Sequence, residues 1–207
     1  MRLLLDSRNP NKLRELRAAL PLWELELLDT PDEPVEDGAT FVDNARIKAR
    51  HGRLHAPSEA WVAGEDSGIE VAALDGRPGV ESARWATDGV GQLLSELGDA
   101  QDRRARYVCE LVVLDPDGAE IRVTGTLEGE VALERRGDEG FGYDPIFVPL
   151  GEARTVATGR RGDEGFGYDP IFVPAGEERT VAELGDDWKR TNSHRARAAA
   201  ALRAALS

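Results

Sequence analysis

Two adjacent carboxylates, Glu65 and Asp66 in the stretch WVAGEDSGIEV, are side chains whose type and spacing suggest chemistry. The apolar residues 61–63 predict the end of a β-strand, and residues 64–68, bounded by glycines, predict a turn. Carboxylates at a strand end suit a magnesium ion, which binds carboxylate oxygens and shares them with substrate phosphates. They also suit a general base. The stretch therefore predicts a metal site, a proton acceptor, or both.

The lysines form a second group, because the chain uses arginine at nearly all its other basic positions. It has 23 arginines but only three lysines, Lys12, Lys48 and Lys189. Lysine is a compact point charge on a flexible stem, whereas arginine is a broad planar fork. Phosphates in a tight pocket can require the former, so the surroundings of each lysine decide its role.

Lys12 follows a pattern that is typical of anion sites. RLLLD (2–6) predicts a short buried strand, SRNPNK (7–12) a turn, and KLRELRAAL a helix with its leucines on one side. The free N–H groups and the dipole of the helix point at such a turn. A lysine in the first helical turn opposes that dipole, and a bound anion would relieve the conflict.

Lys48 lies in a second predicted helix, within VEDGATFVDNARIKARHGRL. Thr40 and Asp43 have the spacing of a capping box at its start. Phe41, Ala45 and Ala49 fall on one face, whereas Asn44 and Lys48, four residues apart, share another.

The remaining segments predict the fold class. LDGRPGVESARW is a loop, TDGVGQLLSELGD a short helix, and RYVCELVVLD and EIRVTGTLEGEVAL two strands joined by a PDGA turn. A last helix begins at about Asn192. Because strands and helices alternate irregularly, the chain is expected to be α/β with a mixed sheet.

Composition excludes several classes of protein. The 207 residues fit one domain or two closely packed lobes, and 41% hydrophobic residues suffice for a core. A net charge of −13 disfavours nucleic-acid polymers and anionic membranes as partners. The single cysteine, Cys109, excludes an internal disulfide and a cysteine-based zinc site. With no apolar run near 18 residues and no signal-peptide pattern, a cytoplasmic location is expected.

One segment occurs twice. RRGDEGFGYDPIFVP runs from Arg135 to Pro149 and again from Arg160 to Pro174, an offset of 25 residues. Residues 135–159 and 160–183 are therefore interpreted as tandem copies of one unit. Without one unit, 182 residues would remain.

Taken together, six ordered motifs resemble the inosine triphosphate pyrophosphatase family, which hydrolyses non-standard purine nucleoside triphosphates. They span nearly the whole chain: SRNPNK, EDGATFVDNARIKA, GEDSGIEV, GRPGVESARW, GFGYDPIF and KRTNSHRA. The resemblance implies an elongated α/β molecule of two lobes with a long curved mixed sheet. It implies a single pyrophosphatase domain over residues 1–207, and a homodimer.

The resemblance also implies roles for named residues. Asp66 and Glu65 would be the catalytic residues: Asp66 would activate the water, with Glu65 beside it to assist. Mg²⁺ would bind to Glu36 and Asp66. Ser67 would touch the substrate. The triphosphate would lie against Ser7, Asn9, Lys12, Lys48 and Lys189. The base would be enclosed by two groups of residues: Phe166, Gly167, Tyr168 and Asp169, and Ser193, His194 and Arg195. A donor from His194 or Arg195 would favour bases with a 6-oxo group.

The repeat leaves open which copy forms the base site, 141–147 or 166–172. The number of residues from TGTLEGEVAL to the first copy matches the family pattern. The number of residues from the second copy to KRTNSHR matches it as well. We expect the second copy to form the site, because it keeps its link to Lys189 and His194. The first copy would then form a protruding excursion. In a third possibility the copies compete, giving two registers or a swapped dimer.

Two other functions fit part of the pattern. A septum-inhibitor type of pyrophosphatase would act on pyrimidine or modified nucleotides, but the Ser193-His194-Arg195 and Phe-Gly-Tyr-Asp pairing argues against it. A nucleotide-binding protein whose catalysis was impaired by the duplication is the other alternative. The predicted function is Mg²⁺-dependent hydrolysis of ITP, dITP and XTP to the monophosphate and pyrophosphate, which cleanses the nucleotide pool.

Overall fold

A computed structural model describes residues 1–131, 147–148, 187 and 190–206. The chain divides into two compact units. Unit 1 comprises Met1–Ser67, Val108–Thr126 and Arg190–Ser207, and unit 2 comprises Gly68–Tyr107 and Leu127–Lys189. Both tandem copies, 135–159 and 160–183, lie outside the described residues except for Phe147 and Val148.

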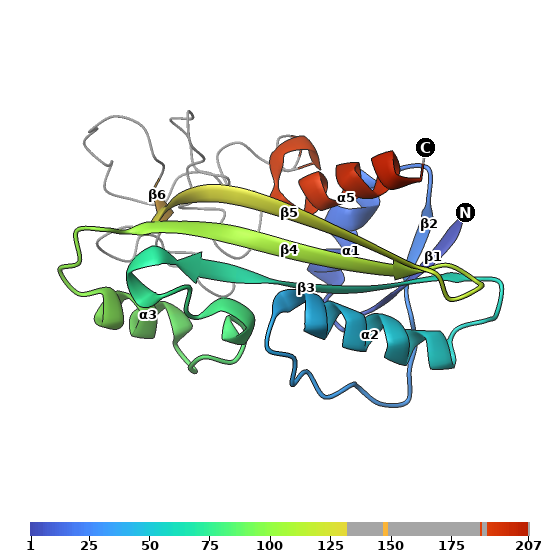
Figure 1. The fold of residues 1–207 in the computed structure, drawn as a ribbon, viewed down its shortest axis with the longest axis horizontal. Helices are drawn as coiled ribbons and strands as arrows, with labels where there is room; N and C mark the ends of the chain where they lie inside the picture. Colours follow the sequence, from blue (N-terminus) through green and yellow to red (C-terminus); the bar gives the residue numbers. More distant parts are fainter. Residues whose placement is uncertain (132–146, 149–186, 188–189, 207) are drawn as a thin grey trace. The chain divides into compact units, whose positions relative to one another are not determined.

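The strands within the described residues form one mixed sheet, as the sequence predicts (Figure 1). They are β1 (Arg2–Asp6), β2 (Glu24–Leu27), β3 (Trp61–Val71), β4 (Arg104–Leu114), β5 (Glu120–Val131) and β6 (Phe147–Val148), in the order β2-β1-β3-β4-β5-β6. β1 pairs in parallel with both β2 and β3, whereas β6 is antiparallel to β5. β2 has no counterpart in the sequence prediction.

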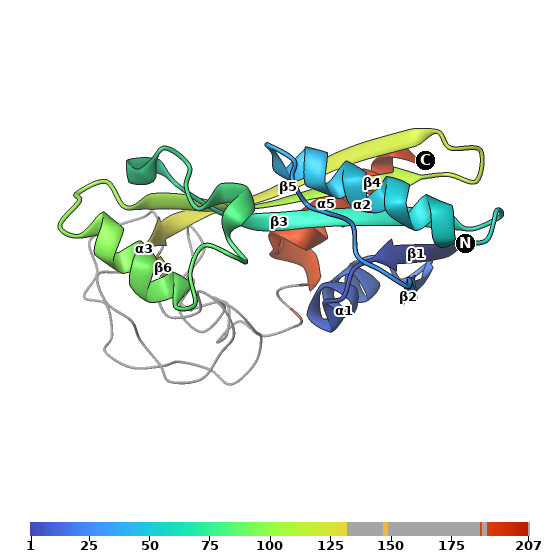
Figure 2. The ribbon, with the colours of Figure 1, turned by 90° about the horizontal axis from the view of Figure 1, so that it is seen from below.

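Three helices of unit 1 cover the two faces of its part of the sheet: α1 (Pro10–Ala19), α2 (Phe41–His55) and α5 (His194–Ala205). Figures 1 and 2 show α1 and α5 on one face and α2 on the other. Two glycines permit close packing. A Cβ at Gly64 of β3 would collide with the Ala45 carbonyl of α2, and one at Gly125 of β5 with the His194 carbonyl of α5.

The predicted start of α2 is confirmed. Thr40 and Asp43 form the capping box of α2: the Asp43 N–H donates to Thr40 Oγ1 (3.3 Å), and the Thr40 N–H to Asp43 Oδ2 (3.1 Å). The α1 helix begins two residues earlier than Lys12. Asn9 caps it, accepting hydrogen bonds from the N–H groups of Asn11 and Lys12.

Unit 2 has its own core, around α3 (Gly89–Leu97), the helix predicted from TDGVGQLLSELGD. Val90, Leu93 and Leu97 are buried there, and Leu94 is partly buried against the same core. Two short 3₁₀ helices, Ala72–Leu74 and Gly79–Glu81, precede α3. At the surface, Arg106 pairs with Glu70 at 2.6 Å.

The predicted turn at residues 64–68 is wrong, because β3 runs unbroken through both glycines. Gly64 is not a turn signal here: it is the point at which the α2 backbone lies against the strand. This matters for the carboxylates, since adjacent residues of a strand point to opposite faces of the sheet.

The expectation that the first copy forms an excursion is wrong at two residues. Phe147 and Val148 belong to that copy, and they pair with Val131 and Glu130 of β5. The corresponding strand residues of the second copy, Phe172 and Val173, lie outside the described residues.

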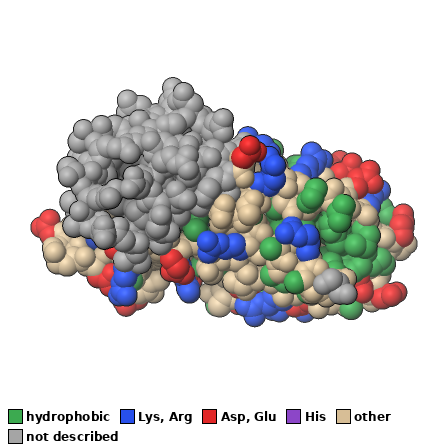
Figure 3. Space-filling model, turned by 90° about the horizontal axis from the view of Figure 1, so that it is seen from above, with side chains coloured by type: hydrophobic (Ala, Val, Ile, Leu, Met, Phe, Trp, Pro, Cys, Tyr) green, Lys and Arg blue, Asp and Glu red, His purple; other side chains and the backbone are tan. Residues whose placement is uncertain are grey.

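The surface of the described residues carries both signs of charge despite the net charge of −13. Figure 3 shows one face, on which Lys and Arg side chains are interspersed with Asp and Glu side chains. Among the described residues, no helix combines the length and apolar character that crossing a membrane requires.

Candidate active site

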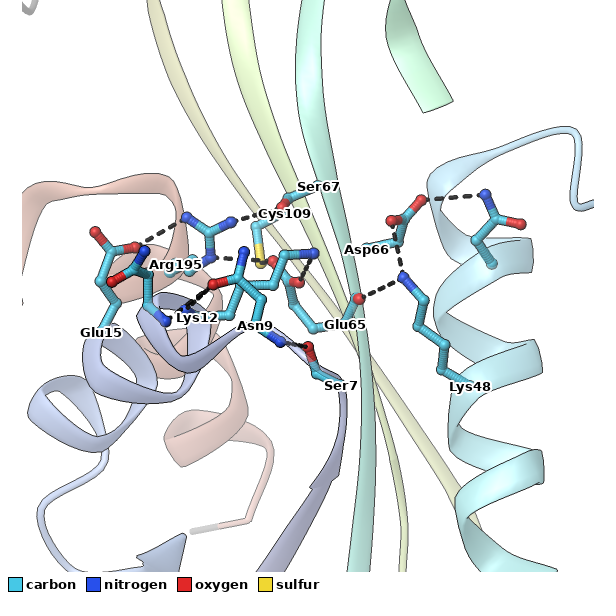
Figure 4. Close-up of polar contacts among 12 residues, drawn as sticks. Ser7, Asn9, Lys12, Glu15, Lys48, Glu65, Asp66, Ser67, Cys109 and Arg195 are labelled. Carbon is cyan, nitrogen blue, oxygen red and sulfur yellow. Dashed lines mark hydrogen bonds and ion pairs between the residues drawn. The ribbon is translucent and has the colours of Figure 1, made fainter. Parts of the chain in front are cut away.

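Asp66 lies on the α2 face of β3, within a buried polar cluster (Figure 4). Its Oδ1 is 3.1 Å from Lys48 Nζ, and its Oδ2 accepts a hydrogen bond from Asn44 Nδ2 at 3.2 Å. Lys48 also contacts Glu36 Oε2 at 2.7 Å and the Glu65 backbone carbonyl at 3.2 Å. One ammonium therefore lies between two carboxylates that are 30 residues apart in the sequence.

The loop before α2 is held in place by the same cluster. Asn44 Oδ1 accepts a hydrogen bond from the Gly38 N–H at 2.8 Å, two residues after Glu36. Asn44 is fully buried, so its amide joins the loop to Asp66 through both of its polar atoms. The shared helix face of Asn44 and Lys48, predicted from their spacing, is thus confirmed as the wall of this cluster.

The Glu65 carboxylate lies on the other face of β3, with no solvent exposure. Lys12 Nζ is 2.6 Å from its Oε2, and Arg195 Nε is 3.1 Å from its Oε1. The Cys109 thiol is 3.5 Å from the same Oε1. Glu65 and Asp66 therefore do not form a paired carboxylate site.

The phosphate turn predicted at residues 7–12 forms a compact, self-bonded loop. The Asn9 N–H donates to Ser7 Oγ at 3.1 Å, and Asn9 caps α1. None of Pro10, Asn11 and Lys12, the first residues of α1, is acidic. The positive end of this helix dipole is therefore not neutralised from within the helix, which favours an external anion.

Burial and charge shift the proton affinities on the two faces differently. Burial raises the pKa of Asp66 above its ordinary value, and Lys48 opposes this only in part. Burial disfavours a charged Lys48, but Asp66 and Glu36 outweigh it and raise the pKa of the ammonium. For Glu65, burial is likewise outweighed, by Lys12 and Arg195, which hold the pKa of that carboxyl well below its usual range.

Arg195 is buried, and each of its three nitrogens has a partner. Nε contacts Glu65 Oε1, Nη1 contacts Glu15 Oε2 at 2.9 Å, and Nη2 donates to Ser67 Oγ at 2.7 Å. Ser193 is buried too, and its Oγ caps α5 by accepting from the Ala196 N–H at 3.1 Å. His194, the first residue of α5, is half-buried.

The structure thus brings together most of the predicted site residues. They form two groups, one on each face of β3. The first contains Glu36, Lys48 and Asp66. The second contains Lys12, Glu65, Ser67 and Arg195, with Ser7 and Asn9 in the adjoining turn (Figure 4). The residues expected around the base, Phe166, Gly167, Tyr168 and Asp169, lie outside the described residues, as does Lys189.

Glu15, the partner of Arg195, was missed by sequence reasoning. Arg195 lies 180 residues from Glu15 in the sequence, so no local pattern could have identified Glu15.

Comparisons with known proteins identify relatives over nearly the whole length. The model of the Ham1 family matches residues 3–160 and again residues 155–205. The two matches contain one copy of the repeat each. A dITP/XTP pyrophosphatase from Exiguobacterium sp. is 42% identical over 76% of this chain and 85% of that protein.

Solved structures agree with the fold. The Ham1 protein of Staphylococcus aureus has a TM-score of 0.75 at 30% identity, covering 100% of this chain and 98% of that chain. A structure described as a nucleoside-triphosphatase, dITP/XTP pyrophosphatase, from Mycobacterium abscessus has a TM-score of 0.69 at 37% identity and covers both chains fully.

Proposed function

The chain belongs to the Ham1 family and is a nucleoside triphosphate pyrophosphatase, and we propose that it hydrolyses dITP, XTP and ITP to the monophosphate and pyrophosphate. The observation that carries this proposal is the cluster around Lys48, in which one ammonium lies within 3.1 Å of two carboxylates. On the other face of β3 lie the N-terminus of α1 and a second lysine, Lys12, which contacts Glu65. These groups suit a polyphosphate, a divalent cation and an attacking water.

The donor set of the cluster fits Mg²⁺. Glu36 and Asp66 supply hard carboxylate oxygens, and both contact the same ammonium, so they are aimed at one region. We propose that these two residues hold the ion. When bound, Mg²⁺ would neutralise charge on the phosphate oxygens and on the departing pyrophosphate.

The triphosphate is proposed to bind at the start of α1. Ser7 and Asn9 shape the turn, the helix N-terminus attracts the anion, and Lys12 and Lys48 supply positive charge. Lys189 joins them on the strength of the sequence resemblance alone. Phosphoryl chemistry of this kind depends chiefly on positioning and charge neutralisation.

Asp66 is proposed as the general base. Burial raises its pKa, which brings a carboxylate closer to the range in which it can accept a proton from water near neutral pH. The water oxygen bonds to the α-phosphorus as the bond from that phosphorus to the bridging oxygen breaks. Asp66 takes the proton, and pyrophosphate leaves.

Glu65 is proposed to position other groups rather than to react. Its buried carboxylate holds Lys12 beside the phosphate turn. It also holds Arg195 in the position from which Arg195 donates a hydrogen bond to Ser67. This replaces the expectation that it assists Asp66 directly, because the two carboxylates lie on opposite faces of β3.

His194 is proposed to contact the base. This role rests on the sequence resemblance, which gives His194 or Arg195 as the donor to a 6-oxo group. The Arg195 nitrogens contact Glu15, Glu65 and Ser67, so we assign Arg195 to holding these groups in place. Adenine presents a 6-amino donor there, so a buried donor would be left unpaired. Such a mismatch costs about 1–3 kcal/mol, or roughly 10- to 100-fold in selectivity.

The homodimer and the cytoplasmic location expected from the sequence stay predictions.

Pyrophosphate release with Mg²⁺, measured in parallel from six nucleotides, tests the function. We expect release from ITP, XTP and dITP to exceed that from ATP and dTTP by at least about tenfold, from the unpaired donor alone. GTP shares the 6-oxo group, so its rejection would show that a further group reads the 2-position. Preference for dTTP would favour the septum-inhibitor type, and tight binding without release would indicate an impaired nucleotide-binding protein.

Alanine at Phe166 and at Phe141 identifies the working copy of the repeat. We propose that the second copy forms the base site, so Phe166→Ala should raise the KM for XTP at least tenfold, whereas Phe141→Ala should not change it. The pairing of β6 with β5 supports a place in the sheet for the first copy. A large KM effect at Phe141 alone would therefore assign the base site to the first copy.

A further inference from the structure

A second group of metal-ligating side chains lies away from the Glu36 and Asp66 pair. Asp32, in the loop after β2, meets His51 and His55 of the last turns of α2, and one ligand atom of each lies within 4.8 Å of the others. We propose that these three side chains form a binding site for a divalent transition-metal ion such as Zn²⁺. The site is independent of the proposed catalytic Mg²⁺.

The separations of the donor atoms fit a tetrahedral ion. Asp32 Oδ1 is 3.0 Å from His51 Nε2 and 3.6 Å from His55 Nε2. Zinc bonds to nitrogen and oxygen of 2.0–2.1 Å at tetrahedral angles place ligand atoms about 3.3–3.4 Å apart. All three ligand atoms lie within 4.8 Å of one another, so side-chain rotations would bring them onto one ion. Asp32 and His55 are exposed, so solvent can supply the fourth ligand.

The His51 ring is already oriented by a partner on its other side. His51 Nδ1 is 2.7 Å from Asp6 Oδ2, and Asp6 is buried at the end of β1. Metal-binding histidines are commonly held by a carboxylate in this way, which fixes the tautomer and directs the other nitrogen to the metal. With Nδ1 directed at Asp6, Nε2 faces the Asp32 carboxylate at 3.0 Å, where a bound cation would take the place of a proton on Nε2.

The other two ligands are positioned as well. Arg8 donates to the backbone carbonyls of Thr30 (3.0 Å) and Asp32 (3.4 Å), and Thr30 Oγ1 donates to the Asp32 carbonyl at 2.8 Å. The loop that carries Asp32 is therefore fixed against the phosphate turn. His55 lies one helical turn beyond His51, with 4.7 Å between the ring centroids. The negative end of the α2 dipole lies here and favours a cation.

The ligand types separate this site from the proposed magnesium site. Two imidazoles and one carboxylate suit zinc, cobalt, nickel or copper, whereas Mg²⁺ prefers oxygen ligands and retained waters. Excess Mg²⁺ should therefore fail to displace a metal bound here. A bound ion would join the end of β1, the loop leading to Glu36 and the helix that carries Lys48, so it should also raise the thermal unfolding midpoint.

Titration of the untagged protein with Co²⁺, in excess Mg²⁺, tests the site. We expect one equivalent of Co²⁺ to give the visible absorption of a tetrahedral nitrogen and oxygen site, and one equivalent of Zn²⁺ to abolish it. His55→Gln and Asp32→Asn should remove the band. Asp6→Asn should weaken Co²⁺ binding about 10- to 100-fold, as the loss of an orienting carboxylate does elsewhere.

Two matched variants complete the experiment. Asp29→Asn removes an exposed carboxylate from the same loop and should leave the band unchanged. Glu36→Gln alters the proposed magnesium site and should also leave it unchanged. A titration without the band, or a band that persists in both His55→Gln and Asp32→Asn, would overturn the proposal. His55 is exposed at the end of α2, so its replacement should not prevent folding.

Discussion

Asp66→Asn should lower kcat by roughly a hundred- to ten-thousand-fold, the usual contribution of a general base, while leaving the thermal unfolding midpoint almost unchanged. The amide cannot accept the proton of the attacking water, and it is a weaker ligand for a cation than the carboxylate. Pyrophosphate release from XTP at saturating Mg²⁺, alongside thermal unfolding of the same samples, measures both effects.

The small effect on stability follows from the environment of Asp66. Burial raises the pKa of this carboxyl, so the folded state tolerates the ionised form less well than water does. A neutral amide of the same size removes that penalty. The substitution also removes the ion pair with Lys48. Since both carboxylate oxygens of Asp66 accept hydrogen bonds, the new amide NH₂ would face a donor, either Asn44 Nδ2 or Lys48 Nζ. These effects oppose each other. Near-normal turnover by Asp66→Asn would rule out Asp66 as the base.

Glu65→Gln, one residue away, should have the opposite phenotype. Replacing this carboxylate removes the buried counter-ion that Lys12 and Arg195 share, although Arg195 keeps its ion pair with Glu15. Breaking a buried ion pair from one side typically costs about 3–5 kcal/mol. Urea unfolding at neutral pH should show a loss of that size. Because Glu65 does not react, kcat should fall only through the displacement of Lys12 and Ser67, and some turnover should remain.

The loss should depend on pH in a defined direction. The folded state lowers the pKa of Glu65, so its ionised carboxylate contributes its full stability above the unfolded-state pKa of about 4.3. That contribution declines as the pH falls from there through the lower folded-state pKa. The difference in unfolding free energy between the wild type and Glu65→Gln should be constant from about pH 7 to 5 and should shrink below about pH 4.

Glu120→Gln is the matched control for this effect. Glu120 pairs with Arg46 at 2.7 Å, but both side chains are 29% exposed. Such a surface pair is worth about 0–1 kcal/mol. An equal loss of stability in the two variants would contradict the buried role of Glu65.

Local patterns in the sequence predicted the parts of the site that local structure determines. The capping box of α2, the turn before α1 and the shared face of Asn44 and Lys48 each depend on residues within four positions of one another. The scarcity of lysine singled out Lys12, Lys48 and Lys189. Of these, Lys12 and Lys48 contact the buried carboxylates of β3, whereas Lys189 lies outside the described residues.

The errors arose where tertiary packing overrides a local signal. Gly64 and Gly68 indicated a turn, yet β3 continues because it lies between β1 and β4, and Gly64 serves the close approach of α2. That one difference moved Glu65 to the opposite face from Asp66. The pairing of Arg195 with Glu15, and of His51 with Asp6, joins residues 180 and 45 positions apart, which a single sequence does not relate.

Hydrolysis of XTP in water labelled with the heavy oxygen isotope tests the central claim most directly, with the products identified by mass spectrometry. Attack at the α-phosphorus predicts one labelled oxygen in the monophosphate and unlabelled pyrophosphate. Labelled orthophosphate together with a nucleoside diphosphate would show attack at the γ-phosphorus instead, and would contradict the assignment of this site as a pyrophosphatase.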